Sequence, residues 1–150
     1  WSVMNIVKIQ QDLIKDCLNN KAYDWFISSY KSAIALLNKC QVFIFPDRNF
    51  LLQESKLKAA GVHSSDTFKN VIEQEVHAEP ARKTGISKEF HGKDCMELNK
   101  LGSNESIYVN KQLLRYYDKN MSFKVINSKS PVFVYEKDSL VGIVLPVVSN

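Results

Sequence analysis

The sequence has 150 residues, which fits one domain that can bury a hydrophobic core without disulfides or metals. Its 45% hydrophobic and 24% charged residues exclude a disordered chain, and no apolar run approaches the roughly 20 residues of a membrane span. The net charge of +4 is compatible with nucleic acid or an acidic protein as partner, and it argues against a mimic of DNA.

The cysteines indicate a reducing environment. Cys17, Cys40 and Cys95 are odd in number and widely spaced, which is typical of free thiols rather than of a disulfide framework. We therefore expect a soluble, cytoplasmic protein without a membrane partner. Residues 1–3 precede Met4 and begin no pattern, so we interpret them as a cloning remnant.

The N-terminal pattern predicts a strand followed by a helix. Residues 4–9 alternate loosely and are rich in β-branched side chains. Residues 10–20 carry one apolar stripe at helical spacing, formed by Leu13, Ile14, Cys17 and Leu18. Lys15 lies on the opposite face of this predicted helix, among uncharged polar residues.

The next segment predicts strands and a second helix. The apolar run 33–37 is short enough to be a strand or a helical turn, and we interpret it as a strand. The runs 42–45 and 50–52 flank the turn 46–49 and predict a hairpin. Helical spacing then recurs over 68–76.

Residues 79–94 predict a long mobile loop. This stretch contains Pro80, Gly85 and Gly92, five basic residues and few apolar ones. Loops of such length in compact domains are functional or disordered, and the pattern does not choose between these two.

Turn and cap signals are clearest after residue 105. A short strand over 106–109 leads to Asn110, which can cap a helix, and 111–119 then carries apolar pairs at helical spacing. Three further apolar segments are separated by polar breaks and predict an antiparallel meander. These segments are 122–127, 131–135 and 140–148.

Three cations recur every four residues along the predicted helix 111–119. Lys111, Arg115 and Lys119 would share one face, without an acid between them. One interpretation is a solvated face of a lysine-rich protein. The other is a helix that faces phosphate groups, with Lys15 as the corresponding cation of the first helix.

No motif in the sequence supports catalysis. A phosphate-binding Gly-rich loop, a His-Glu-x-x-His helix and a Gly-x-Ser-x-Gly turn are all absent. The best metal candidates are His77, His91 and Cys95, with His63 further off. His91 and Cys95 have i, i+4 spacing, but a zinc site needs four ligands in short pairs. We therefore predict a non-enzymatic protein without metal or cofactor.

Both ends of the chain resemble a bacterial replication sliding clamp, the β subunit of DNA polymerase III. The resemblance lies in residues 4–15 and in the two apolar runs 130–135 and 144–147. The predicted fold is α+β, a single domain with two or three short helices on an antiparallel, possibly split sheet. The resemblance implies that a strand-helix-sheet unit is repeated twice and that its two helices line a positive inner surface. A clamp chain has three such domains, so one domain would need a homo-oligomer, a hexamer, to encircle DNA.

In that family a partner peptide docks in an apolar cleft near the C-terminus. The resemblance places Leu145, Pro146 and Val147 at this cleft, and the alternative is an ordinary end of an edge strand. The predicted function is a replication, phage or plasmid accessory protein that contacts DNA or a replication partner. The alternative is a counter-defence protein that binds and blocks a host protein.

Overall fold

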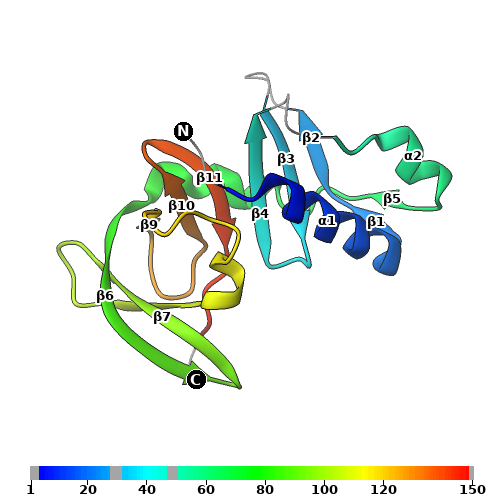
Figure 1. The fold of residues 1–150 in the computed structure, drawn as a ribbon. Coiled ribbons are helices and arrows are strands. Elements are labelled where there is room, and N and C mark those ends of the chain that lie inside the picture. The colour runs from blue at the N-terminus through cyan, green and yellow to red at the C-terminus, as the bar shows by residue number, and fades with distance from the viewer. Residues whose placement is uncertain (1–3, 28–31, 47–50, 149–150) are drawn as a thin grey trace.

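The protein is a single α+β domain in a computed structural model that describes residues 4–27, 32–46 and 51–148 (Figure 1). The described helices are α1 (Ile6–Asn20), α2 (Glu54–Ala59) and α3 (Lys69–Glu73), with the 3₁₀ helices η2 (Gln74–His77) and η3 (Lys111–Leu114). The first strands are β1 (Ala22–Tyr23), β2 (Trp25–Ile27), β3 (Ser32–Leu37), β4 (Gln41–Pro46) and β5 (His63–Ser64). The later strands are β6 (Glu79–Phe90), β7 (Lys93–Lys100), β8 (Ser106–Asn110), β9 (Ser122–Val125), β10 (Val132–Glu136) and β11 (Ser139–Val144). None of the described helices is long and apolar enough to span a membrane.

Nine strands form one antiparallel sheet in the order β2-β3-β4-β11-β10-β9-β6-β7-β8, and β1 and β5 form a small parallel sheet. The predicted meander is confirmed, because β9, β10 and β11 are neighbours with antiparallel pairing. The backbone N–H of Val147, just after β11, donates to the carbonyl of Tyr108 in β8 over 2.8 Å. The strands from β11 round to β8 therefore close into a ring of six, and β2, β3 and β4 extend from it toward α1 (Figure 1).

The N-terminus is helical, so the strand predicted over 4–9 is wrong. The side chain of Asn5 accepts a hydrogen bond from the backbone N–H of Lys8, and this cap starts α1 at Ile6. Ile9 is buried one turn before Leu13, which extends the apolar stripe backwards at helical spacing. The loose alternation of the first residues was therefore the first turn of the helix.

The hairpin predicted around 46–49 is also wrong, although the strand over 33–37 is confirmed as β3. β4 pairs with β3 and β11, and residues 51–53 belong to no strand. Residues 47–50 lie outside the described residues. The turn that reverses the chain contains Asn38 and Lys39, which both have left-handed φ values of 52° and 60°.

Residues 79–94 form strand β6 and the start of β7 rather than a loop. The turn between the two strands is His91-Gly92, and both residues have positive φ, 51° and 77°. Such a two-residue turn suits the twist of a hairpin. The stretch resembled a loop because most side chains of β6 are exposed, so polar residues occupy both of its faces.

The predicted helix over 111–119 shortens to η3. Asn110 does cap it, since its Oδ1 accepts from the N–H of Gln112 over 3.0 Å. Residues 115–117 form a turn and a bend instead of a further helical turn, and within them Tyr116 and Tyr117 are both buried. Lys111, Arg115 and Lys119 therefore do not share one helical face.

Most of the buried apolar residues form one cluster. Ile9 and Leu13 of α1 belong to it together with Phe43, Leu98 and Val134 of the strands, and all five are fully buried. A smaller cluster packs Phe68, just before α3, against β10 and β11. The helix predicted over 68–76 is confirmed in this coarse sense, as α3 followed by η2.

Candidate nucleic-acid interface

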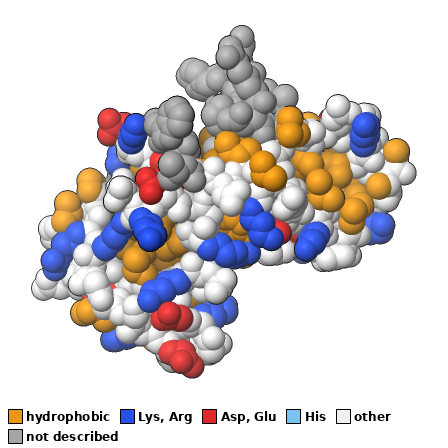
Figure 2. Space-filling view, in the orientation of Figure 1, with side chains coloured by type: hydrophobic (Ala, Val, Ile, Leu, Met, Phe, Trp, Pro, Cys, Tyr) orange, Lys and Arg blue, Asp and Glu red, His pale blue; other side chains and the backbone are white. Residues whose placement is uncertain are grey.

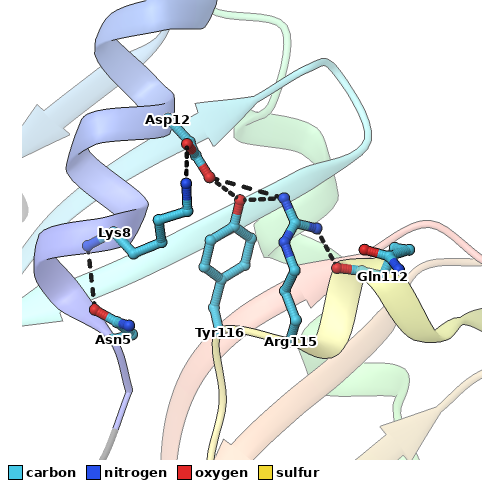
Figure 3. Close-up of polar contacts among 6 residues, drawn as sticks. All are labelled: Asn5, Lys8, Asp12, Gln112, Arg115 and Tyr116. Atoms are coloured by element: carbon cyan, nitrogen blue, oxygen red, sulfur yellow. Dashed lines mark hydrogen bonds and ion pairs between the residues drawn. The ribbon is translucent and has the colours of Figure 1, made fainter.

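Asp12 lies at a junction between α1 and the segment that follows η3 (Figure 3). Its Oδ2 accepts a hydrogen bond from the Tyr116 hydroxyl and lies 3.7 Å from Nη2 of Arg115. Its Oδ1 lies 3.1 Å from Nζ of Lys8. The Arg115 guanidinium covers the Tyr116 ring at 4.4 Å from the centroid and donates to the carbonyl of Gln112. One carboxylate therefore fixes Arg115 against a helix about a hundred residues away in sequence.

The surroundings of Asp12 and Tyr116 determine whether each of these side chains is protonated. Burial raises the pKa of Asp12, but the hydrogen bonds from Tyr116 and Lys8 and the charges of Lys8 and Arg115 outweigh burial, so the pKa lies below its usual value. Burial and the hydrogen bond to Asp12 raise the pKa of Tyr116 to about 12. At neutral pH the carboxylate is therefore charged and the phenol is neutral.

Beside this junction lies an open groove of about 480 Å³, which we call the polar groove. It is lined by Lys8, Asp12, Lys15, Asp16, Asn19, Asn20, Asn38, Arg115 and Tyr116. Two of the four cations predicted to bind nucleic acid, Lys15 and Arg115, meet here. Lys15 is exposed and makes no hydrogen bond or ion pair within the described residues, whereas Arg115 is held by Asp12.

Lys111 and Lys119 lie elsewhere. The ammonium of Lys111 donates to Oγ of Ser87 over 2.6 Å and pairs with Asp94 over 3.3 Å, which ties η3 to the hairpin of β6 and β7. The carbonyl of Lys119 accepts from Nζ of Lys83 over 3.0 Å. Lys111, Arg115 and Lys119, which were predicted to share one face, therefore take part in separate contacts.

Basic side chains are nevertheless spread over one face of the molecule. Figure 2 shows Lys and Arg side chains across this face, from the ring of strands to the helical part, with fewer acids between them. Lys8 and Lys83 take part in the contacts described above, but neither was predicted from the sequence as a site residue. Lys8 precedes Lys15 by two helical turns, so a helix beginning at Ile6 would have revealed it.

The residues predicted to bind a partner, Leu145, Pro146 and Val147, line an apolar groove. It consists of two adjoining cavities of about 310 and 300 Å³ that share Cys40 and Leu145. The other lining residues are Lys39, Gln41, Val42, Thr67, Phe68, Val71 and Ile143 in one cavity, and His91, Lys93, Asn110, Leu113, Pro146, Val147 and Val148 in the other. None of these described lining residues is acidic, so any charge at the groove is positive.

The remaining candidates for a functional site are clusters of metal ligands and reactive cysteines. No group of three or more His, Cys, Asp or Glu side chains is placed to hold a metal ion within 4–27, 32–46 and 51–148. The three cysteines are free, and burial raises the pKa of each thiol. Comparison with protein-family models, with curated proteins and with solved structures finds no match to this chain.

Proposed function

We propose that the protein binds nucleic acid at the polar groove through phosphate contacts of Lys8, Lys15 and Arg115. The observation that carries this proposal is the convergence of three cations from α1 and from the segment after η3 on one open groove. Phosphate contacts supply most of the sequence-independent affinity for nucleic acid. The protein then acts as a non-enzymatic accessory factor in replication or in a phage or plasmid, and its free thiols favour a cytoplasmic setting.

The two acidic residues of the polar groove, Asp12 and Asp16, are hydrogen-bonded to or paired with other residues of the protein. Asp12 holds Lys8 and Arg115, and Asp16 accepts from Nδ2 of Asn20 over 2.6 Å and from the backbone N–H of Asn38 over 2.9 Å. Both carboxylates therefore hold other residues that line the groove in place. They also offset part of the positive charge of the groove, so we expect modest affinity.

The test is the salt dependence of binding to a fluorescent single-stranded oligonucleotide. We expect the affinity to fall as salt rises, and Lys15→Gln to reduce the log–log slope by about 0.7, the value for one lost phosphate contact on a single strand. Lys129→Gln is the matched control, because Lys129 is exposed, makes no ion pair within the described chain and does not line the groove. Absence of binding at low salt would refute the proposal.

The apolar groove supports a second function, the binding and blocking of a host or phage protein. Its apolar floor and the lysines at its rim suit an apolar segment that carries acidic residues. Leu145→Asp should abolish such binding while leaving the polar groove unchanged, which separates the two functions. The relationship to sliding clamps stays a prediction, and sedimentation with and without DNA would test the ring of copies that it requires.

A further inference from the structure

Helix α1 carries more apolar surface than its contact with the core covers. Its buried apolar residues recur every four residues from Ile9 to Cys17. Val7, Ile14 and Leu18 lie on another face of the helix, at positions i, i+7 and i+11, and they are 66%, 38% and 41% exposed. An apolar stripe on a helix normally packs against a partner. The core therefore uses one apolar face of α1 and leaves a second one open.

The open face of α1 forms one wall of a groove, which we call the helix groove. The groove has a volume of about 330 Å³ and lies between α1 and α2. Ile14 and Leu18 line it from α1, Leu57 from α2, and Leu51 and Leu52 from the segment before α2. Figure 2 shows hydrophobic side chains gathered over the helical part of the molecule, with Lys and Arg side chains beside them. An exposed apolar surface with a polar rim is typical of a docking site for another protein.

The form of the helix groove suits a third helix. Leu57 is buried and Leu52 is half-buried, so the groove is apolar below its exposed walls. Along α1 the residues of the open face, 7, 11, 14 and 18, are spaced by four, three and four, which is the spacing of a heptad seam. Such a seam packs against the apolar stripe of another helix. An extended peptide would need the free edge of a strand, and the two helices do not provide one.

The charges around the helix groove favour an acidic partner. Lys56 lines the groove, and Lys8 and Lys15 flank the seam of α1 because each lies three or four residues from Gln11. None of the described residues that line the groove is acidic. Glu54 of α2 is already paired within its own helix over 3.2 Å. A second copy of the chain would bring lysines against lysines, whereas acidic residues of a partner would lie next to them.

We propose that the helix groove binds an amphipathic helix of a partner protein, with glutamate or aspartate residues on both sides of its apolar stripe. The apolar stripe packs between α1 and α2, and the acidic residues contact Lys15 of α1 and Lys56 of α2. This surface is distinct from the apolar groove at Leu145, with which it shares no lining residue. The inference does not rest on phosphate binding in the polar groove.

The probe is a synthetic peptide of about 21 residues, three heptads with leucine at positions a and d and glutamate at positions e and g. Repulsion between the glutamates of two copies keeps the peptide from pairing with itself at neutral pH. A second peptide carries lysine in place of glutamate. By fluorescence anisotropy in about 0.15 M salt, we expect the wild-type protein to bind the glutamate peptide at least about tenfold more tightly than the lysine peptide.

Leu18→Lys distinguishes docking in the groove from simple attraction between charges. The variant removes an apolar anchor and adds a cation, so binding of the glutamate peptide should weaken about tenfold. Attraction by charge alone would instead strengthen it. Leu101→Lys is the matched control, because Leu101 is also an exposed leucine, does not line the groove and should tolerate the change without loss of binding.

Lys56→Glu tests the charge of the rim. It should weaken binding of the glutamate peptide and reduce the difference between the two peptides, because an acid then lies at the groove. Lys129→Glu makes the same change at an exposed lysine away from the groove and controls for net charge. Near-UV circular dichroism verifies that each variant is folded.

The outcomes identify the occupant of the helix groove. Absence of binding to the glutamate peptide, equal binding of both peptides, or unchanged binding by folded Leu18→Lys overturns the proposal. A wild-type protein that sediments as a dimer, and as a monomer in Leu18→Lys, would make a second copy the occupant. Binding to phosphatidylserine vesicles without binding to the peptide would make the occupant a lipid surface. Either of these last two results also overturns the proposal of an acidic helix.

Discussion

The ring of strands and the N-terminal part of the molecule are held together in different ways (Figure 1). In the ring, neighbouring strands are joined by antiparallel ladders, and every residue of β10 is buried. The N-terminal part depends more on single polar anchors, such as Asp12 with Tyr116 and Asp24 with Thr67. We therefore expect the ring to be sensitive to packing changes and the N-terminal part to be sensitive to charge.

The largest effect is expected where the two parts meet, at Phe43 of β4. Its ring is fully buried and packs edge-on against Tyr116, with 5.2 Å between the ring centroids, and against Tyr117 at 5.9 Å. Phe43→Ala should lower the free energy of unfolding by about 3–5 kcal/mol, because it leaves a cavity among these rings. Urea denaturation measures this, with exposed Leu101→Ala as the control, which should change stability by less than about 0.5 kcal/mol. A loss below about 1 kcal/mol would show that the two parts do not depend on this contact.

The next effect lies within the ring, at Gly142 of β11. A Cβ atom at this position would lie 1.8 Å from Oη and 2.7 Å from Cζ of Tyr117. The tyrosine ring is buried and cannot swing away freely, so Gly142→Ala should cost about 2–3 kcal/mol by overpacking.

Tyr117→Phe tests the cause of that cost. The Tyr117 hydroxyl is buried without a hydrogen-bond partner among the described residues, so its removal alone should be nearly neutral. Combined with Gly142→Ala it should restore part of the lost stability, because Oη is the nearest obstacle. Strict additivity of the two changes in thermal unfolding would mean that the clash lies elsewhere.

Whether a strand pairs with its neighbour in the chain explains which strands could be predicted from the sequence. The meander was predictable because apolar runs in β9, β10 and β11 are separated by short polar breaks, and each run pairs with its neighbour in the chain. β6 was not predictable in this way, since most of its side chains are exposed and one of its two partners, β9, is distant in the chain, with Glu79 pairing with Val125. Its only local signal was the Gly92 turn.

The candidate site was predictable only in part. The sequence indicated Lys15 and Arg115 as exposed cations, and the structure brings both to one groove. It could not indicate that Asp12 would meet Tyr116, because this contact joins segments 104 residues apart. The helix groove was missed for the same reason, since it exists only once α2 lies beside α1 in the folded chain.

A charge-dependent effect is expected at the junction of α1 with the ring. Asp12→Asn removes the charge that accepts from Tyr116 and pairs with Lys8 and Arg115, and it should cost about 1.5 kcal/mol at neutral pH. The pKa of Asp12 is lowered in the folded protein, so its contribution is present above the ordinary carboxyl pKa of 3.8 and is lost as pH falls through the folded value. Urea denaturation at neutral and acid pH should therefore show the difference between wild type and variant shrinking at acid pH. Asp138→Asn, at the exposed turn of β10 and β11, is the control and should show no such difference. A difference that persists at low pH would assign the effect to packing.

The smallest effect distinguishes Lys15 from Arg115, two of the three cations that line the polar groove. Lys15→Gln should change the free energy of unfolding by less than about 0.5 kcal/mol, because its side chain is exposed and makes no hydrogen bond or ion pair within the described residues. Arg115→Gln should cost about 1 kcal/mol, a value kept low because 46% of its side chain is exposed to screening solvent. It also removes the stacking on Tyr116.

For nucleic-acid binding the order should differ from the order for stability. Each variant removes one cation from the groove, so both should weaken binding at low salt to a similar extent although only Arg115→Gln is destabilised. Urea denaturation and fluorescence anisotropy on the same samples measure the two properties. If binding instead followed stability, with Lys15→Gln binding like the wild type, then Lys15 would be an ordinary solvated lysine and Arg115 would serve to fasten the ring to α1.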